Sequence, residues 1–299
     1  MSDDAEWLVE LGAAPSPAQF LYRDVIARQR AAYSSFARGY EVDAERRETW
    51  AGRWLQPAMR HIDLGGRKKS AVRVLDVGSG IGTFAGHLAR EGFDVWAIDI
   101  ADEMVKRTRA RLRGVYGSDA QRRAVRGSFM EHDFASQRFD LILGVAFVHC
   151  LPKPVDVLAM RKMARLLTPD GIAYLTTTDE PDGGEALALK DAMRGERDGT
   201  LMRRYRTRYT PTQFIERIRA SGLTPWSWPR QGAPVELDRS TPSNNMPIFQ
   251  DTHVRRKRWV DVVATRSGVP LPMPTVYAGA AEPARSHEKP PTAPLAVVG

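Results

Sequence analysis

Three glycines and a carboxylate lie in the part of the chain where binding chemistry is easiest to recognise. Gly78, Gly80 and Gly82 occupy alternate positions, and Asp76 stands two residues before the first of them. A glycine turn that binds a pyrophosphate has its third glycine three residues after the second, where this chain has Thr83. The charge of Asp76 would also repel a pyrophosphate, whereas it suits a ligand with a positive amine or sulfonium group.

The elements around this turn are predicted to be a strand, a helix and a second strand. The apolar run 72–77 indicates the first strand, the helical pattern covers 81–90, and the second strand over 95–98 ends on Asp99. Glycine is favoured in the turn because the chain must adopt φ values that a Cβ penalises. The free N–H groups at the start of the helix then face the ligand. A generic strand-helix-strand unit with two solvated aspartates would show the same pattern. Further matches along the chain are therefore needed to distinguish it from a cofactor site.

The segment Asp76–Gly82 resembles the E/D-x-G-x-G-x-G motif of the class I S-adenosylmethionine-dependent methyltransferases. Farther along, Phe139–Leu143 resembles the FDxIx strand of that family, and Val148–Pro152 resembles the turn that follows it. The resemblance runs from about Tyr33 to Arg266. It implies an enzyme of the small-molecule type that transfers a methyl group, with S-adenosylmethionine as its cofactor.

The resemblance also implies contacts with that cofactor. Asp76 would neighbour the methionine amine, and Gly78 and Gly80 would pack directly on the cofactor. Asp99 would accept both ribose hydroxyls, which suits a carboxylate because it can accept several hydrogen bonds. The other cofactor contacts implied are Tyr33, Tyr40, Ser79, Ile100, Ser128, Phe129 and Gly144.

Two of these contacts carry an alternative. Ser128 stands where the family often has Asp, and a hydroxyl reaches the adenine amine less firmly than a carboxylate does. Tyr33 and Tyr40 fit the family's Y-x-x-x-A-x-x-Y pattern, whose aromatic residues close over the cofactor. Both tyrosines would equally suit a hydrophobic core.

Methyl transfer from a sulfonium is a direct displacement, so the enzyme mainly has to align the reacting groups. A base helps only when the acceptor carries a proton. His149, just past the fourth predicted strand, is the candidate base, with a packing role as the alternative. Tyr205 and Tyr209 stand among arginines and could anchor an acidic acceptor or simply pack. Tyr174 and Cys150 are expected to be core residues.

The fold predicted is α/β: a Rossmann-like, seven-stranded, mostly parallel sheet whose last strand is antiparallel, with helices on both faces and an N-terminal helical cap. The remaining strands are expected at 124–127, 139–143, 171–177, 223–228 and 259–265. The remaining helices are expected at 101–113, 155–167 and 211–221, with two more inside the segment 17–61.

Three regions are predicted: the cap over 1–65, the cofactor-binding core over 66–267 and a disordered tail over 268–299. Two insertions in the core, 178–210 and 229–254, lie where substrate recognition is expected. The first insertion contains a predicted helix over 185–194.

The composition of the chain limits the classes of partner that we expect. The chain has 299 residues and a net charge of +8, which permits an anionic partner. No nucleic-acid-binding module is recognisable, so the expected partner is a small-molecule methyl acceptor, nucleic acid is not expected, and a homodimer stays open. No apolar run reaches membrane length and the acidic start is no signal peptide, so we expect no membrane partner and a cytoplasmic location. One cysteine and six scattered histidines predict no metal site.

Two other functions stay open at this stage. The arginine clusters would suit an RNA or protein methyltransferase. Because a fold alone does not establish activity, a cofactor-binding protein that methylates nothing is the other alternative. After the fourth predicted strand the chain reads Gly144–Phe147 and lacks an N/D-P-P-Y motif, which argues against methylation of exocyclic amino groups in DNA. A specialised metabolite modified at O, N or C is the expected acceptor.

Overall fold

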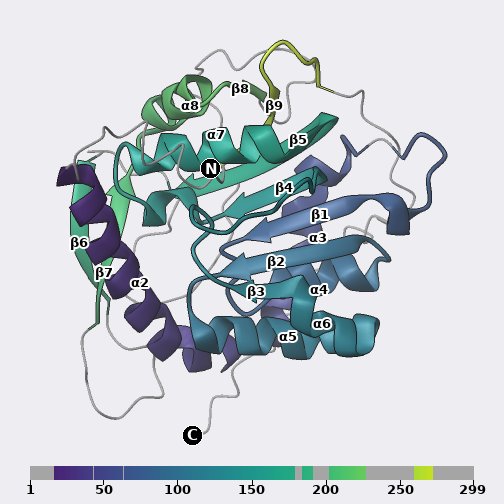
Figure 1. Ribbon diagram of the computed structural model, residues 1–299, viewed down its shortest axis with the longest axis horizontal. Coiled ribbons are helices and arrows are strands. Elements are labelled where there is room, and N and C mark those ends of the chain that lie inside the picture. The colour runs from purple at the N-terminus through teal and green to yellow at the C-terminus, as the bar shows by residue number, and fades with distance from the viewer. Residues whose placement is uncertain are drawn as a thin grey trace, which may run out of the picture.

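The computed structural model describes residues 17–42, 44–62, 64–178, 184–190, 202–226 and 259–271. Seven strands form one sheet in the order β3-β2-β1-β4-β5-β9-β8 (Figure 1). Their bounds are β1 Arg73–Val77, β2 Asp94–Asp99, β3 Ala124–Arg126, β4 Phe139–Val145, β5 Leu167–Thr178, β8 Leu223–Trp226 and β9 Trp259–Arg266. Strands β3, β2, β1, β4 and β5 pair in parallel, whereas β9 runs antiparallel to both β5 and β8. The predicted Rossmann-like sheet is confirmed.

Helices cover both faces of this sheet. Their bounds are α2 Pro17–Val42, α3 Ala44–Met59, α4 Thr83–Arg90, α5 Asp102–Tyr116, α6 Ala120–Arg123, α7 Val155–Leu166 and α8 Pro211–Ala220. Short 3-10 turns are η2 Lys69–Ala71, η3 Gly117–Asp119 and η4 Val148–Cys150. Helix α8 begins sharply because Thr210 and Gln213 form a reciprocal capping box and Pro211 occupies the first turn.

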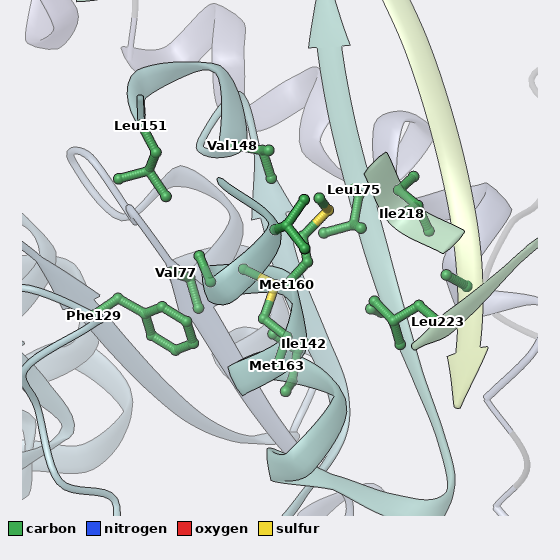
Figure 2. Close-up of a cluster of buried hydrophobic side chains, with 14 of the residues drawn as sticks. Val77, Phe129, Ile142, Val148, Leu151, Met160, Met163, Leu175, Ile218 and Leu223 are labelled. Atoms are coloured by element: carbon green, nitrogen blue, oxygen red, sulfur yellow. The ribbon is translucent and has the colours of Figure 1, made fainter. Parts of the chain in front are cut away.

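The two faces of the sheet carry separate hydrophobic cores because successive strand residues point to opposite sides. In β4, Ile142 faces α7 and α8, whereas Leu141 and Leu143 face α3, α4 and α5. Figure 2 shows the first of these cores, where Met160 and Met163 of α7 pack against Ile142. Because both faces are buried, the middle of β4 reads Leu141-Ile142-Leu143, without alternation of apolar and polar residues.

The helix predicted over 185–194 is wrong where the structure describes it. Residues Gly184–Lys190 form strand β6, which pairs antiparallel with β7, Met202–Arg208. The sequence Glu185–Lys190 has good helix formers, but cross-strand pairing with β7 outweighs that weak preference. The remaining residues of the predicted helix lie outside the described part of the chain, as does the insertion 229–254.

Helix α2 packs against β7 and α5, and it runs across the side of the molecule at which the central strands end (Figure 1). Ion pairs attach the end of α2 and helix α3 to the core. The carboxylate oxygens of Glu41 lie 2.8 Å from a guanidinium nitrogen of Arg111 and 3.1 Å from one of Arg107, and a carboxylate oxygen of Glu48 lies 3.2 Å from Arg111 Nε. The two predicted N-terminal helices are therefore present. The cap, core and tail boundaries remain predictions, and only 268–271 of the predicted tail is described.

None of the described helices is both long and apolar enough to cross a membrane.

Candidate functional site

Asp76 and Asp99 lie at the carboxyl edge of the neighbouring parallel strands β1 and β2, and both are buried. The two carboxylate oxygens of Asp99 accept backbone N–H groups from Gly80 at 2.8 Å and from Ala101 at 2.9 Å. Asp76 accepts the N–H of Ala85 in α4 at 3.2 Å. The backbone therefore holds both carboxylates on either side of the glycine turn.

Burial makes both carboxylates costly to ionise. It raises the pKa of Asp76 to about 7, and the nearby charge of Asp99 adds to that rise. Burial also raises the pKa of Asp99 to about 6, although its backbone hydrogen bonds oppose the rise. A positively charged ligand between them would favour the ionised forms. The site therefore suits a cation and not a phosphate.

The three glycines of the turn differ in the free space beside them. Gly78, Gly80 and Gly82 all have positive φ, which explains the choice of glycine. A Cβ on Gly78 would lie 2.8 Å from the ring of Phe147, and one on Gly82 would lie 2.8 Å from Thr108. A Cβ on Gly80 would meet no atom within 4 Å. Gly80 is thus the position of the turn that leaves room for a ligand.

Helix α5 supports this turn through residues that the sequence reading missed. The hydroxyl of Thr108 donates to the carbonyl of Gly80 at 2.9 Å, and the guanidinium of Arg111 donates to the carbonyl of Ile81 at 2.9 Å. Ser79, predicted at the cofactor, has its hydroxyl 3.5 Å from that of Thr108. The sequence shows that Thr108 is a polar residue on the buried face of α5, but it gives no sign that its partner is Gly80.

Ser128 and Phe129 lie just after β3 and are buried. The hydroxyl of Ser128 accepts the N–H of Met130 and is also hydrogen-bonded to the hydroxyl of Tyr22 on α2. Phe129 packs edge-on against Phe147, the ring that covers Gly78. These aromatic residues connect the end of β3 with the glycine turn, although Tyr22 already uses part of the Ser128 hydroxyl.

Tyr33 and Tyr40 pack against Ile81, after the glycine turn, and Ala101, after Asp99. The hydroxyl of Tyr33 also lies 3.2 Å from the thiol of Cys150. Both tyrosines are thus near the turn and partly buried, a position compatible with either role considered from the sequence. Ile100 joins Asp99 to Ala101 at the same place.

The turn η4 holds His149 against the end of β5. Val148 and Leu151 on either side of it are buried in the core of Figure 2 and anchor the turn. His149 is 3% exposed, and its Nδ1 lies 3.3 Å from the hydroxyl of Thr177. Just before it, Ala146 has a φ of +56°, with its N–H held by the Thr176 hydroxyl. This left-handed residue turns the chain sharply at the end of β4.

The remaining candidates are buried within the described part of the protein. Gly144 is buried in β4, where a Cβ would lie 2.8 Å from Leu175, so the core alone requires glycine there. Tyr174 is buried and donates to the carbonyl of Trp54 at 3.0 Å, as expected of a core residue. Tyr209 is fully buried and donates to Asp156 at 2.7 Å, away from the glycine turn. Tyr205 is buried on β7, so neither tyrosine is solvated.

No group of three or more histidine, cysteine, aspartate or glutamate side chains that could hold a metal ion occurs among the residues that the structure describes.

Comparisons with known proteins concern the same region. Residues 74–171 match a family model described as a methyltransferase domain. Over 134 residues the chain is 35% identical to a ubiquinone biosynthesis O-methyltransferase of Xanthomonas oryzae, an alignment that covers 44% of this chain and 51% of the relative. The chain thus matches about half the length of this curated relative.

Two solved structures share the fold. The 1,6-didemethyltoxoflavin-N1-methyltransferase of Burkholderia thailandensis superposes with a TM-score of 0.54 at 22% identity, covering 85% of this chain and 92% of that one. An S-adenosylmethionine-dependent methyltransferase of Clostridium acetobutylicum gives a TM-score of 0.52 at 13% identity, covering 79% of this chain and all of that one. At these identities the likeness concerns the fold.

Proposed function

Because residues 74–171 match a family model described as a methyltransferase domain, we propose that this protein is a class I, Rossmann-like methyltransferase that transfers a methyl group from S-adenosylmethionine to a small molecule. One observation carries the proposal: two buried carboxylates flank an open glycine turn at the carboxyl edge of the sheet. The charge of this pair suits a sulfonium and an ammonium group, and ligands of open α/β sheets bind at that edge.

The residues present fit this cofactor. Each oxygen of Asp99 accepts one backbone N–H and keeps capacity for one ribose hydroxyl. Asp76 places a negative charge near the position assigned to the methionine amine. The open side of Gly80 leaves space for ligand atoms, and Phe129 offers an apolar surface for a ring.

When bound, S-adenosylmethionine supplies a methyl group on a positively charged sulfur. The chain's own task is to orient the acceptor and to exclude water, which supplies most of the acceleration in such a displacement. Helix α2 and the β6-β7 hairpin lie over the carboxyl edge, where they would enclose the acceptor. His149, in the turn beside that edge, would take the proton from an acceptor oxygen or nitrogen.

The name of the Xanthomonas relative supports a small molecule as the acceptor. We include specialised metabolites in the proposal, with the methyl group going to an oxygen, nitrogen or carbon atom. Mass spectrometry of methylated products formed in an extract of the producing cell would identify the acceptor. Binding of RNA that weakens steeply with added salt would favour a nucleic-acid substrate instead.

The substitution Asp99→Ala tests the proposal. We expect it to weaken S-adenosylmethionine binding about 100-fold, because two charge-assisted hydrogen bonds to the ribose are lost. Calorimetry measures the dissociation constant, and circular dichroism checks the fold. The control is Asp102→Ala, since Asp102 is an exposed carboxylate only three residues away. Equal affinity in the Asp99 variant and the wild type would contradict the ribose assignment, and retention of NAD in place of S-adenosylmethionine would contradict the function.

Cofactor binding should depend on pH. The folded protein raises the pKa values of Asp76 and Asp99 to about 7 and about 6, so their contribution to stability is full below pH 4 and is lost as pH rises through those values. A cationic cofactor prefers the ionised pair, so its affinity should be about tenfold higher at pH 8 than at pH 5.5. The variant Asp76→Asn should flatten this profile. A profile equally steep in the variant would show that Asp76 is not responsible.

A further inference from the structure

Gln29 connects three elements that surround the turn of His149. It lies on α2, one turn before Tyr33, and is 3% exposed. Its Nε2 donates to the carbonyl of Cys150 in η4 at 3.1 Å and to the carbonyl of Tyr205 in β7 at 2.8 Å. The side chain therefore holds the residue next to His149 against the hairpin.

These two carbonyls determine which way the amide points. An amide NH₂ has two donors, and both are used here. The flipped amide would set its oxygen against two carbonyl oxygens, so Oε1 must point away from them. Within the described part of the chain, Oε1 of Gln29 is buried and has no hydrogen-bond partner. Buried polar atoms without a partner are rare because they carry the full cost of losing water.

The surroundings of this oxygen favour a role in recognition. The carboxyl edge of β4 and β5 is where open α/β sheets bind ligands. Two other polar groups described at this edge have partners within the protein: Nδ1 of His149 lies by the Thr177 hydroxyl, and the N–H of Ala146 donates to the Thr176 hydroxyl. Among the residues that the structure describes, Gln29 thus presents a buried acceptor in a fixed direction with nothing to accept.

We propose that Oε1 of Gln29 accepts a hydrogen bond from an N–H or O–H group of the methyl acceptor. This inference rests on the proposed function and narrows its substrate class: the acceptor carries a second hydrogen-bond donor beside the atom that is methylated. The cost of the unpaired oxygen is then removed on binding, which favours an acceptor with that donor over one without it.

Catechol and phenol are the matched probes, because phenol lacks one of the two adjacent hydroxyls of catechol. Their dissociation constants are measured by calorimetry in the presence of saturating S-adenosylhomocysteine. We expect the wild type to bind catechol about 10- to 100-fold more tightly than phenol. The variant Gln29→Met, of similar shape, should reduce this ratio to about the intrinsic difference between the probes, roughly twofold. Loss of the contacts to Cys150 and Tyr205 affects both probes alike, so the ratio isolates Oε1.

The control is Gln121→Met, on the exposed surface of α6, which should leave the ratio unchanged. An unchanged ratio in Gln29→Met overturns the inference, as does binding of neither probe. If Gln29→Met does not fold, the wild type still decides, because equal affinities for catechol and phenol refute a donor-specific contact. Failure to bind S-adenosylhomocysteine would instead refute the proposed function, and this inference with it.

Discussion

Replacing His149 by alanine should lower the turnover number about 100-fold or more for an acceptor that must lose a proton, the usual contribution of a general base. The position of His149 in the structure is the reason for this expectation. The turn η4 is anchored by buried neighbours on both sides, and Nδ1 of His149 is oriented by the Thr177 hydroxyl at 3.3 Å. In the tautomer whose Nδ1–H donates to the Thr177 oxygen, Nε2 has the free lone pair and would act as the base. Transfer of a labelled methyl group measures the rate, and calorimetry should show unchanged cofactor affinity.

Three further measurements make this test decisive. In the variant Thr177→Val the ring loses its orienting hydroxyl, so the rate should fall by a smaller factor, about tenfold. With S-adenosylmethionine saturating at every pH, the acidic limb of the pH-rate profile should disappear in His149→Ala, because that limb then reports protonation of the base. His132, which packs edge-on against Phe134, provides the control, since His132→Ala should retain the wild-type rate. A wild-type rate in His149→Ala would assign His149 to packing.

Most of the sheet could be predicted because its strands have local signatures. The strands β1, β2 and β4 are short and mostly apolar: Gly78 follows β1, Asp99 ends β2, and Gly144 lies near the end of β4. Such runs are typical of strands buried on both faces. The β6-β7 hairpin could not be predicted in this way. Its first strand consists of residues that also form helices well, and only the partner Met202–Arg208 decides its structure. Pairing between distant segments is invisible to a local pattern.

The residues of the candidate site also differ in whether a local sequence pattern reveals them. Asp76 and Gly80 could be located because they belong to one contiguous motif with a specific spacing, and Asp99 because it ends the next predicted strand. Tyr22, Gln29 and Thr108 could not, because each acts on a segment far away in the sequence. Tyr22 reaches Ser128, Gln29 reaches Cys150, and Thr108 reaches Gly80. A single sequence gives spacing within a segment, whereas these contacts depend on how helices pack over the sheet.

Asp156 also makes its contacts with distant segments, so no sequence motif singled it out. We expect it to contribute strongly to stability. Asp156 is 0% exposed at the start of α7. Its carboxylate accepts the Tyr209 hydroxyl at 2.7 Å and Nε of Arg217 at 2.8 Å, and a second nitrogen of Arg217 reaches its other oxygen. The group thereby joins α7, the end of β7 and α8. It also places a negative charge in the first turn of a helix, where the helix dipole favours one.

We expect Asp156→Ala to lower the free energy of unfolding by about 3 kcal/mol, because removing one partner of a buried ion pair leaves the other uncompensated. Arg217 keeps 26% of its side chain exposed and can regain some water, so the lower end of the usual range applies. Urea unfolding followed by circular dichroism measures the change. The matched control is Asp24→Ala, since Asp24 and Arg28 form an exposed pair within α2 and should contribute little. Equal losses in the two variants would mean that the Asp156 network is no more than a surface contact.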